Sequence, residues 1–137
     1  MIVLIDTNVL LDVIQDRKPY SVSAARVWKL VEDRAIVGYV SAISFNNVFY
    51  IARKQAGSEK ALEAVRLIRR VFQIVALDDQ VIDRALTVSG NDFEDALQAA
   101  AALHVTADYL VTRNTSDFAS LGVPFVTPEE FLAIVEP

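Results

Sequence analysis

Short apolar runs alternate with longer amphipathic stretches along the whole chain. The first run, Ile2–Ile5, is apolar at every position, as expected for a strand that is buried on both faces of a sheet. In the longer stretches, apolar residues recur every three or four positions, which is the period of a helix with one buried face. Strands are expected at about residues 2–5, 37–40, 74–77, 109–112 and, more briefly, 124–126. Helices are expected at about residues 7–14, 21–33, 44–55, 58–71, 78–86, 92–103 and from 127 onward.

Strands that alternate with helices along a chain usually lie parallel in one sheet, with the helices packed on its faces. The sequence therefore predicts an α/β fold with three layers, helix, sheet and helix, around a central, mainly parallel sheet of four to five strands. A chain of 137 residues fits a single domain, 1–137, that buries about two-thirds of the surface exposed by its unfolded chain.

The composition narrows the class of protein. Hydrophobic residues make up 53% of the chain, which is typical of a globular domain. No apolar run approaches the ~18–20 residues that span a bilayer, and the first residues do not resemble a signal sequence. The chain has no cysteine, which excludes disulfides and a thiolate nucleophile and argues against a structural zinc site. These features fit a cytoplasmic protein.

The charge is distributed unevenly. A net charge of −5 argues at first against a nucleic-acid partner, because phosphates are usually bound by Lys and Arg. Residues 53–70, however, contain six basic side chains against two acidic ones, a local balance of +4. A solvated helix face explains such a run equally well. The candidate basic surface for RNA consists of Arg53, Lys54, Arg66, Arg69 and Arg70.

Three polar clusters are expected at one edge of this sheet. They are Asp6–Asn8, Asn91–Asp95 and Thr112–Asn114, the last followed closely by Asp117. Ligands of an open parallel sheet bind in the crevice beyond the carboxyl ends of the strands. A cluster of carboxylates without Cys or His suits a hard cation such as Mg²⁺ or Mn²⁺, which prefers oxygen ligands. The sequence therefore predicts an acidic metal site at this edge.

The acids at this edge also have a purely structural explanation. Asp6 and Asp92 stand where helices begin, where aspartate is a favoured N-cap, as Ser21 or Ser23 would be for the second helix. Asp95 differs, because it lies three residues after Asp92 on an alanine-rich helix suited to close packing against the sheet. A carboxylate held there without a partner or a metal is unfavourable. We therefore expect a functional Asp95 and leave the role of Asp92 open.

Four segments, in this order along the chain, carry a resemblance to a known family. They are Ile5–Leu10, Ser41–Ser44 with the helix that follows, Asp92–Leu97 and Thr112–Phe118. Each is short, but together they resemble the PIN-domain nucleases, particularly the VapC-like toxins of prokaryotic toxin–antitoxin pairs. The resemblance extends from the first strand nearly to the end of the chain.

The resemblance implies a PIN-like fold and a magnesium- or manganese-dependent endoribonuclease. Asp6, Asp95 and Asp117 match the family acids that are catalytic and hold the metal, and Asp92 is a further candidate ligand. The residues expected to support these acids or to contact substrate are Thr7, Asn8, Ser41, Asn47, Thr112, Arg113 and Asn114. The resemblance also implies RNA as the substrate, a homodimer, and a cognate antitoxin protein as partner.

One position departs from the family pattern. The family usually has glutamate six residues after the serine matched by Ser41, and this chain has Asn47 there. An amide keeps an oxygen that can bind metal, but it has no charge and cannot act as a base. Asp92 is the candidate to supply the missing charge from a neighbouring turn. The alternative function is therefore a catalytically weak or inactive PIN module that binds RNA or a protein partner.

Overall fold

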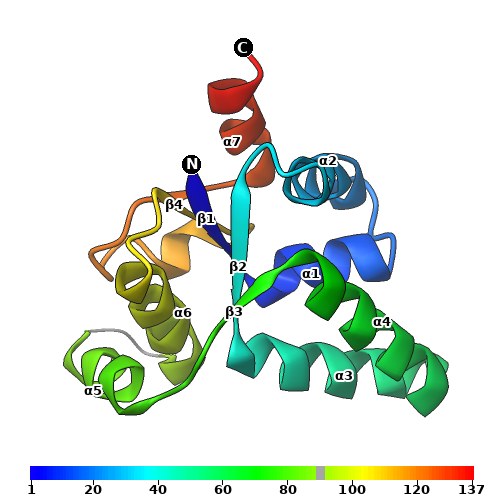
Figure 1. Ribbon diagram of the computed structural model, residues 1–137, viewed down its shortest axis with the longest axis horizontal. Helices are drawn as coiled ribbons and strands as arrows, with labels where there is room; N and C mark the ends of the chain where they lie inside the picture. The colour runs from blue at the N-terminus through cyan, green and yellow to red at the C-terminus, as the bar shows by residue number, and fades with distance from the viewer. Residues whose placement is uncertain (89–91) are drawn as a thin grey trace.

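The computed structural model describes residues 1–88 and 92–137, and Figure 1 shows their arrangement. Asn91, part of the second polar cluster, lies outside the described residues. Five strands form one sheet in the order β3-β2-β1-β4-β5, and all neighbouring strands are parallel. The strands are β1 (Ile2–Ile5), β2 (Val37–Ser41), β3 (Gln73–Val75), β4 (Tyr109–Val111) and β5 (Phe125–Val126).

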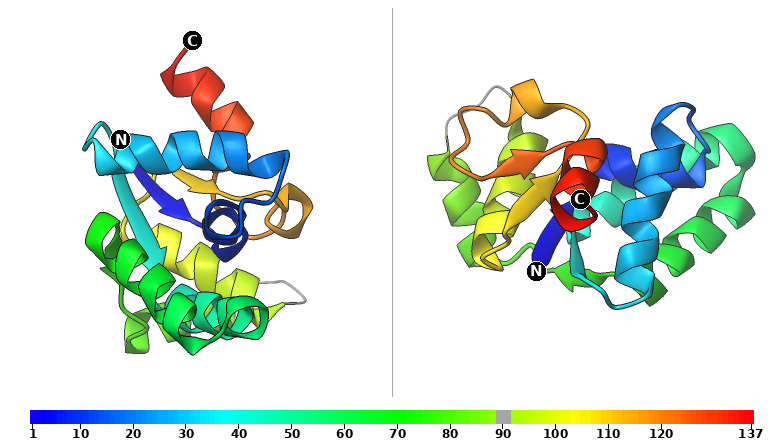
Figure 2. Two further views of the ribbon diagram at one scale, coloured as in Figure 1. Left: turned by 90° about the vertical axis from the view of Figure 1, so that its right-hand side faces the viewer. Right: turned by 90° about the horizontal axis from the view of Figure 1, so that it is seen from above.

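Helices cover both faces of this sheet. They are α1 (Thr7–Ile14), α2 (Tyr20–Glu32), α3 (Ala42–Ala56), α4 (Ser58–Val71), α5 (Asp79–Thr87), α6 (Phe93–His104) and α7 (Pro128–Val135), with a 3₁₀ turn, η1, at Thr115–Asp117. The right-hand view of Figure 2 places α5 and α6 on one side of the sheet and α1 to α4 on the other. The predicted three-layer α/β/α arrangement is therefore confirmed. In the described part of the chain, no helix has the length and apolar character needed to cross a membrane.

Side chains of β1 alternate between two hydrophobic cores, as the period of a strand requires. Val3 and Ile5 pack on one face of the sheet, in a core that includes residues of α1, α2, α4 and α7. Leu4 packs on the other face, with residues of α5 and α6. All three side chains are at most 2% exposed. The continuous apolar run at the start of the chain is therefore explained by burial on both faces.

Two local expectations were wrong. Neither Ser21 nor Ser23 caps the second helix, because α2 begins at Tyr20 and no side chain bonds its first turn. The strand expected at 74–77 is instead Gln73–Val75, because its partner residues in β2 extend only from Tyr39 to Ser41. The hydrophobic period shows that these elements exist, whereas pairing with neighbours sets where they end.

The carboxyl ends of β1 and β4 form the branch point of the sheet. After β1 the chain passes through α1 and α2 to β2 on one side, whereas after β4 it continues to β5 on the other side. Connections that leave neighbouring parallel strands in opposite directions open a crevice between them, and ligands bind there. Asp6 follows β1 and Thr112 follows β4, and the backbone N–H of Asp6 donates to the carbonyl of Val111 (3.0 Å). Both residues therefore lie at the crevice.

Helix α6 approaches the sheet closely because one whole turn of it is made of alanines. Ala99–Ala102 are completely buried. They belong to the same core as Leu4 of β1 and Leu110 of β4. The small side chains bring the first turn of α6, which carries Asp95, close to the end of β1.

Candidate metal centre

Asp6 is fixed through both oxygens of its carboxylate. Its side chain is 5% exposed. Oδ1 accepts a hydrogen bond from the backbone N–H of Thr7 (2.7 Å), which makes Asp6 the N-cap of α1. Oδ2 accepts a hydrogen bond from the Thr112 hydroxyl (2.8 Å), and that hydroxyl accepts one from the Asn114 N–H (3.1 Å). Asp6 is thus the helix cap that the structural explanation predicted, and it also lines a cavity, as a metal site at this edge of the sheet requires.

The first turn of α6 contributes the second group of acids. Asp92 is the N-cap of this helix, and its Oδ1 accepts hydrogen bonds from the N–H groups of Glu94 (2.8 Å) and Asp95 (3.4 Å). Asp92 is exposed, whereas Glu94 and Asp95 are half-buried. The capping explanation of Asp92 is therefore confirmed, and the side chains of Glu94 and Asp95 remain free of this role.

These acids converge on one cavity of about 380 Å³. It is lined by residues of α1, α3 and α6 and by the segments that follow β1, α1 and β4. Its acidic lining consists of Asp6, Asp92, Glu94, Asp95 and Asp117. The structure thus brings the three predicted catalytic acids to one cavity, together with Glu94, which the sequence interpretation did not single out.

Burial and repulsion make the charged form of Asp6 unfavourable. Burial raises the pKa of Asp6 to about 6, although the hydrogen bonds from Thr112 and Thr7 act in the opposite direction. The negative charges of Glu94 and Asp117 raise this pKa further. A nearby cation would offset both effects, because it favours the ionised carboxylate.

Asp95 is affected in the same way. Burial makes the largest contribution to raising its pKa to about 7. The remaining contributions come from the charges of Asp92, Asp6, Asp117 and Glu94. Four acids are therefore near enough to Asp95 to repel its charge, which is the electrostatic setting of a cation site.

The donors present fit a hard cation that keeps part of its water shell. Within residues 1–88 and 92–137, no three His, Cys, Asp or Glu side chains are close enough together to enclose a metal ion by themselves. Mg²⁺ usually keeps several waters and is bound through one or two carboxylates plus substrate phosphate. Asp6 and Asp95 supply such oxygens from two rigid elements. The residues therefore fit a partly hydrated Mg²⁺ or Mn²⁺ rather than a closed site.

Asn47 contacts Glu94, one of the acids that line the cavity. The Asn47 side-chain N–H donates to Glu94 Oε1 (2.8 Å), which joins α3 to the first turn of α6. The acid brought to the unusual asparagine is thus Glu94, whereas the oxygen of Asp92 is engaged by the helix cap. The chain offers one sequence signal for this contact, the run of three acids at Asp92, Glu94 and Asp95.

A buried polar cluster supports the base of the site. The Thr7 and Ser44 hydroxyls are 2.8 Å apart, and the Gln98 amide donates to both oxygens (3.2 and 3.0 Å). Gln98 and Ser44 are fully buried, as is Ser41, whose hydroxyl has no hydrogen-bond partner among the described residues. The sequence interpretation missed Gln98, whose signal is an isolated polar residue on the alanine-rich face of α6, one turn after Asp95.

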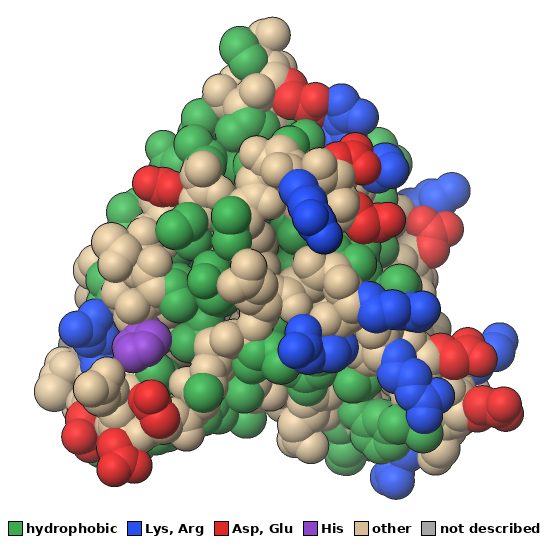
Figure 3. Space-filling model, viewed as in Figure 1, with side chains coloured by type: hydrophobic (Ala, Val, Ile, Leu, Met, Phe, Trp, Pro, Cys, Tyr) green, Lys and Arg blue, Asp and Glu red, His purple; other side chains and the backbone are tan. Residues whose placement is uncertain are grey.

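The remaining predicted residues are divided between the cavity and the outer surface. Asn8 and Arg113 line the cavity, and the Arg113 N–H donates to Asn8 Oδ1 (3.4 Å). None of the five residues of the basic surface lines it. Arg70 instead lines a hollow with Arg34 and the first residues of β2, at the opposite end of the strands. Figure 3 shows Lys and Arg side chains gathered over the α3 and α4 side of the molecule.

Known proteins share this fold. A family model described as PIN domain matches residues 2–116. A DNA-bound VapBC structure from Salmonella typhimurium has a TM-score of 0.76 and 18% identity, covering 93% of this chain and 98% of that one. A toxin–antitoxin complex from Klebsiella pneumoniae has a TM-score of 0.69 and 26% identity, covering 92% and 97%. A sarcin–ricin-loop-cleaving VapC toxin from Mycobacterium tuberculosis has a TM-score of 0.70 and 14% identity, covering 88% and 95%. No curated protein sequence gives a significant match.

Proposed function

Because the chain belongs to the PIN domain family of nucleases, we propose that it is a metal-dependent endoribonuclease that hydrolyses RNA phosphodiester bonds. The observation that carries the proposal is the convergence of Asp6, Asp95 and Asp117 on one cavity at the branch point of the sheet. The test is cleavage of single-stranded RNA with added Mg²⁺ or Mn²⁺ by the wild type and by Asp6→Asn. An RNA substrate places the activity in the cytoplasm.

The residues of the chain divide the work of the site. Asp6 and Asp95 would present carboxylate oxygens to a divalent cation, and Asp117 would add negative charge from η1. Thr112 and Thr7 hold the Asp6 carboxylate in a single orientation through their hydrogen bonds. When bound, the cation would polarise the phosphoryl group and lower the pKa of an attacking water.

The similar solved structures suggest a partner. Several are toxin–antitoxin complexes, among them the Klebsiella pneumoniae structure and VapBC-1 from Haemophilus influenzae. We extend the proposal accordingly: the chain is the toxin of a toxin–antitoxin pair. That it forms a homodimer is proposed from the family resemblance alone. Co-expression with the protein encoded beside it, followed by isolation of a stable complex, tests the partner.

Glu94 is proposed to supply the negative charge that Asn47 lacks. Asn47 donates to one oxygen of Glu94 and thereby holds this carboxylate at the wall of the cavity. The alternative of an inactive module rested on the absence of a charge at Asn47. Because Glu94 of α6 supplies a negative charge beside Asn47, the active nuclease is the favoured function.

The expected effect of Glu94→Gln is weaker metal binding. Substitution of a residue that orients the metal ligands typically lowers metal affinity about 10–100-fold. We therefore expect Glu94→Gln to bind Mn²⁺ at least about 10-fold more weakly in titration calorimetry. Glu59→Gln, an exposed glutamate of α4, is the matched control and should bind Mn²⁺ as the wild type does. Equal affinities for wild type and Glu94→Gln would reject the role of Glu94. A wild type that binds neither Mg²⁺ nor Mn²⁺ at millimolar concentration would reject the metal site itself.

The basic surface on α3 and α4 is proposed to bind RNA away from the reacting phosphate. Charge reversal by Arg66→Glu with Arg69→Glu should weaken RNA binding and flatten its dependence on salt. For single-stranded RNA the slope of log affinity against log salt falls by about 0.7 for each phosphate that the protein no longer neutralises. Arg84→Glu, on the opposite side of the sheet, is the control. If the double variant bound RNA as tightly as the wild type at low salt, this surface would have no role.

A further inference from the structure

The wall of the cavity is not uniformly acidic, because two arginines line it as well. Arg17 comes from the loop between α1 and α2, and Arg113 follows β4. Both contact Asp12 of α1. Within residues 1–88 and 92–137, neither arginine forms an ion pair with any of the acids that line the cavity. The arginines are therefore not placed to neutralise the metal-binding acids.

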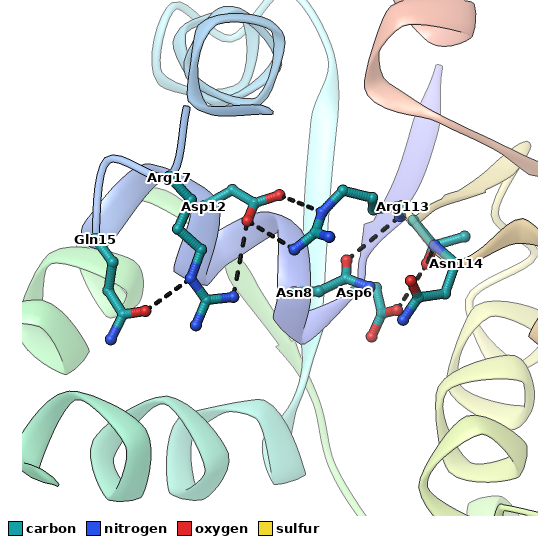
Figure 4. A network of polar contacts seen from close by, with 8 residues as sticks. Asp6, Asn8, Asp12, Gln15, Arg17, Arg113 and Asn114 are labelled. Carbon is teal, nitrogen blue, oxygen red and sulfur yellow. Dashed lines mark hydrogen bonds and ion pairs between the residues drawn. The ribbon is translucent and has the colours of Figure 1, made fainter. Parts of the chain in front are cut away.

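Asp12 is the buried anchor of both arginines. Its side chain is 1% exposed. Arg113 donates to both of its oxygens, from Nε (2.9 Å) and from Nη2 (3.0 Å), and Nη1 of Arg17 lies 3.8 Å from Oδ1. Figure 4 shows the two guanidinium groups turned toward Asp12 from opposite sides. One buried carboxylate thus holds two cations, leaving the group with a net positive charge.

Further contacts fix the orientation of each guanidinium. Arg113 lies over the ring of Tyr20, 4.1 Å from its centroid. Nε of Arg17 donates to Gln15 Oε1 (2.8 Å). Side chains that are already ordered lose less entropy when a ligand binds. The arginines are therefore organised in advance for a ligand in the cavity.

Both arginines keep donors that a ligand can reach. The Arg113 side chain is 28% exposed and that of Arg17 is 36% exposed. Asp12 engages two of the N–H donors of Arg113, and a guanidinium has about five. Planar guanidinium groups match the geometry of phosphate better than ammonium groups do. The exposed edges of Arg17 and Arg113 are thus suited to a phosphodiester group.

We propose that Arg17 and Arg113, both anchored by Asp12, form a clamp for a backbone phosphate of RNA next to the one that is cleaved. The assignment of RNA as the ligand rests on the proposed nuclease function. The acids of the cavity then hold the cation, while the two arginines hold the strand. The clamp fixes the register of the strand, and Asp12 acts as a positioning residue that does not touch the substrate.

Binding of a short, fluorescently labelled single-stranded RNA to the full chain in EDTA tests the clamp without metal or cleavage. Arg17→Gln should weaken binding about 5–10-fold and lower the salt slope by about 0.7, as expected when one phosphate is no longer neutralised. This variant leaves both hydrogen bonds between Arg113 and Asp12 in place, so its fold should be kept. Arg26→Gln, an exposed arginine that pairs with Glu136, is the matched control and should bind as the wild type does.

Arg113→Gln removes the two hydrogen bonds to buried Asp12, so its melting temperature is measured beside its RNA affinity. A folded Arg113→Gln variant should lose at least as much RNA affinity as Arg17→Gln. Replacing one RNA phosphate by an uncharged methylphosphonate identifies the contact, because the effects of that change and of Arg17→Gln should not add at the clamped position.

Wild-type affinity and salt slope in Arg17→Gln would overturn the clamp. So would a variant that binds RNA normally but loses affinity for an oligo-glutamate peptide, because the arginines would then recognise a carboxylate of a protein. The nuclease proposal is judged separately. If the wild type cleaves RNA and Arg17→Gln binds RNA normally, only the clamp is rejected. If Arg17→Gln binds RNA more weakly but the wild type shows no cleavage, only the nuclease function is rejected.

Discussion

Asp6→Asn is expected to abolish metal-dependent RNA cleavage while the protein stays folded. The substitution removes the charge of a carboxylate that is 5% exposed, and it leaves an oxygen that can still accept the Thr7 N–H. Substitution of a residue that only supports the metal ligands already lowers affinity or activity by about 10–100-fold. Loss of a proposed direct ligand should therefore lower the cleavage rate by more than about 100-fold. The rate is measured on single-stranded RNA at saturating Mn²⁺.

Two controls separate this effect from damage to the fold or from a contaminating nuclease. Asp83→Asn changes an exposed acid of α5 in the same way and should cleave at the wild-type rate. Thermal unfolding should show that Asp6→Asn is at least as stable as the metal-free wild type, because the substitution removes a buried charge that neighbouring acids repel. Cleavage by Asp6→Asn at the wild-type rate, or wild-type cleavage that persists in EDTA, would contradict the proposed site.

The metal-free protein is expected to lose stability as the pH rises from about 4 to 7. The pKa of Asp6 is about 6 and that of Asp95 about 7 in the folded protein, whereas both are near 3.8 in the unfolded chain. Between these values the folded state holds protons that the unfolded chain has released, so the free energy of unfolding falls with rising pH. For buried Asp6 the loss is on the order of 1–3 kcal/mol. Asp95 acts in the same direction.

Urea denaturation at several pH values in EDTA measures this slope. Asp6→Asn should show a shallower slope, because one of the two titrating groups is gone. Saturating Mg²⁺ should raise the stability of the wild type most at neutral pH, since the cation binds the ionised acids of the folded state and not the unfolded chain. A flat pH profile in EDTA, or the same slope in Asp6→Asn, would show that burial and repulsion do not raise the pKa values of these acids as described.

The order and type of the elements follow from local sequence patterns. The continuous apolar run Ile2–Ile5 and the helical period after it predict β1 and α1 without reference to the rest of the chain. Parallel alternation of strands and helices then implies that polar residues after the strands meet at one edge. Asp6 and Thr112 could therefore be placed near one another before any contact between them was known. Their hydrogen bond connects residues that lie 106 positions apart.

Contacts between the faces of separate helices could not be predicted in this way. Periodicity assigns Asn47 and Glu94 to their helices, but the contact between them depends on how α3 and α6 are placed around the sheet. The same holds for Asp12, which reads as one polar residue in an apolar helix until Arg113 is brought to it by β4. The sequence therefore defined the acids of the site better than the residues that orient them.

The alanines of α6 have a consequence for how this site tolerates genetic variation. Ala99–Ala102 are completely buried in the core that α6 shares with the sheet and α5, yet none of them lines the cavity. A larger side chain at a position that faces the sheet would push α6 away from β1 and displace Asp95 from Asp6, because a packed core yields only by shifting its neighbours. Natural selection at these positions then acts on side-chain volume rather than on chemistry. Mutations at positions that do not line the cavity would in this way disturb the proposed site as much as loss of one of its acids.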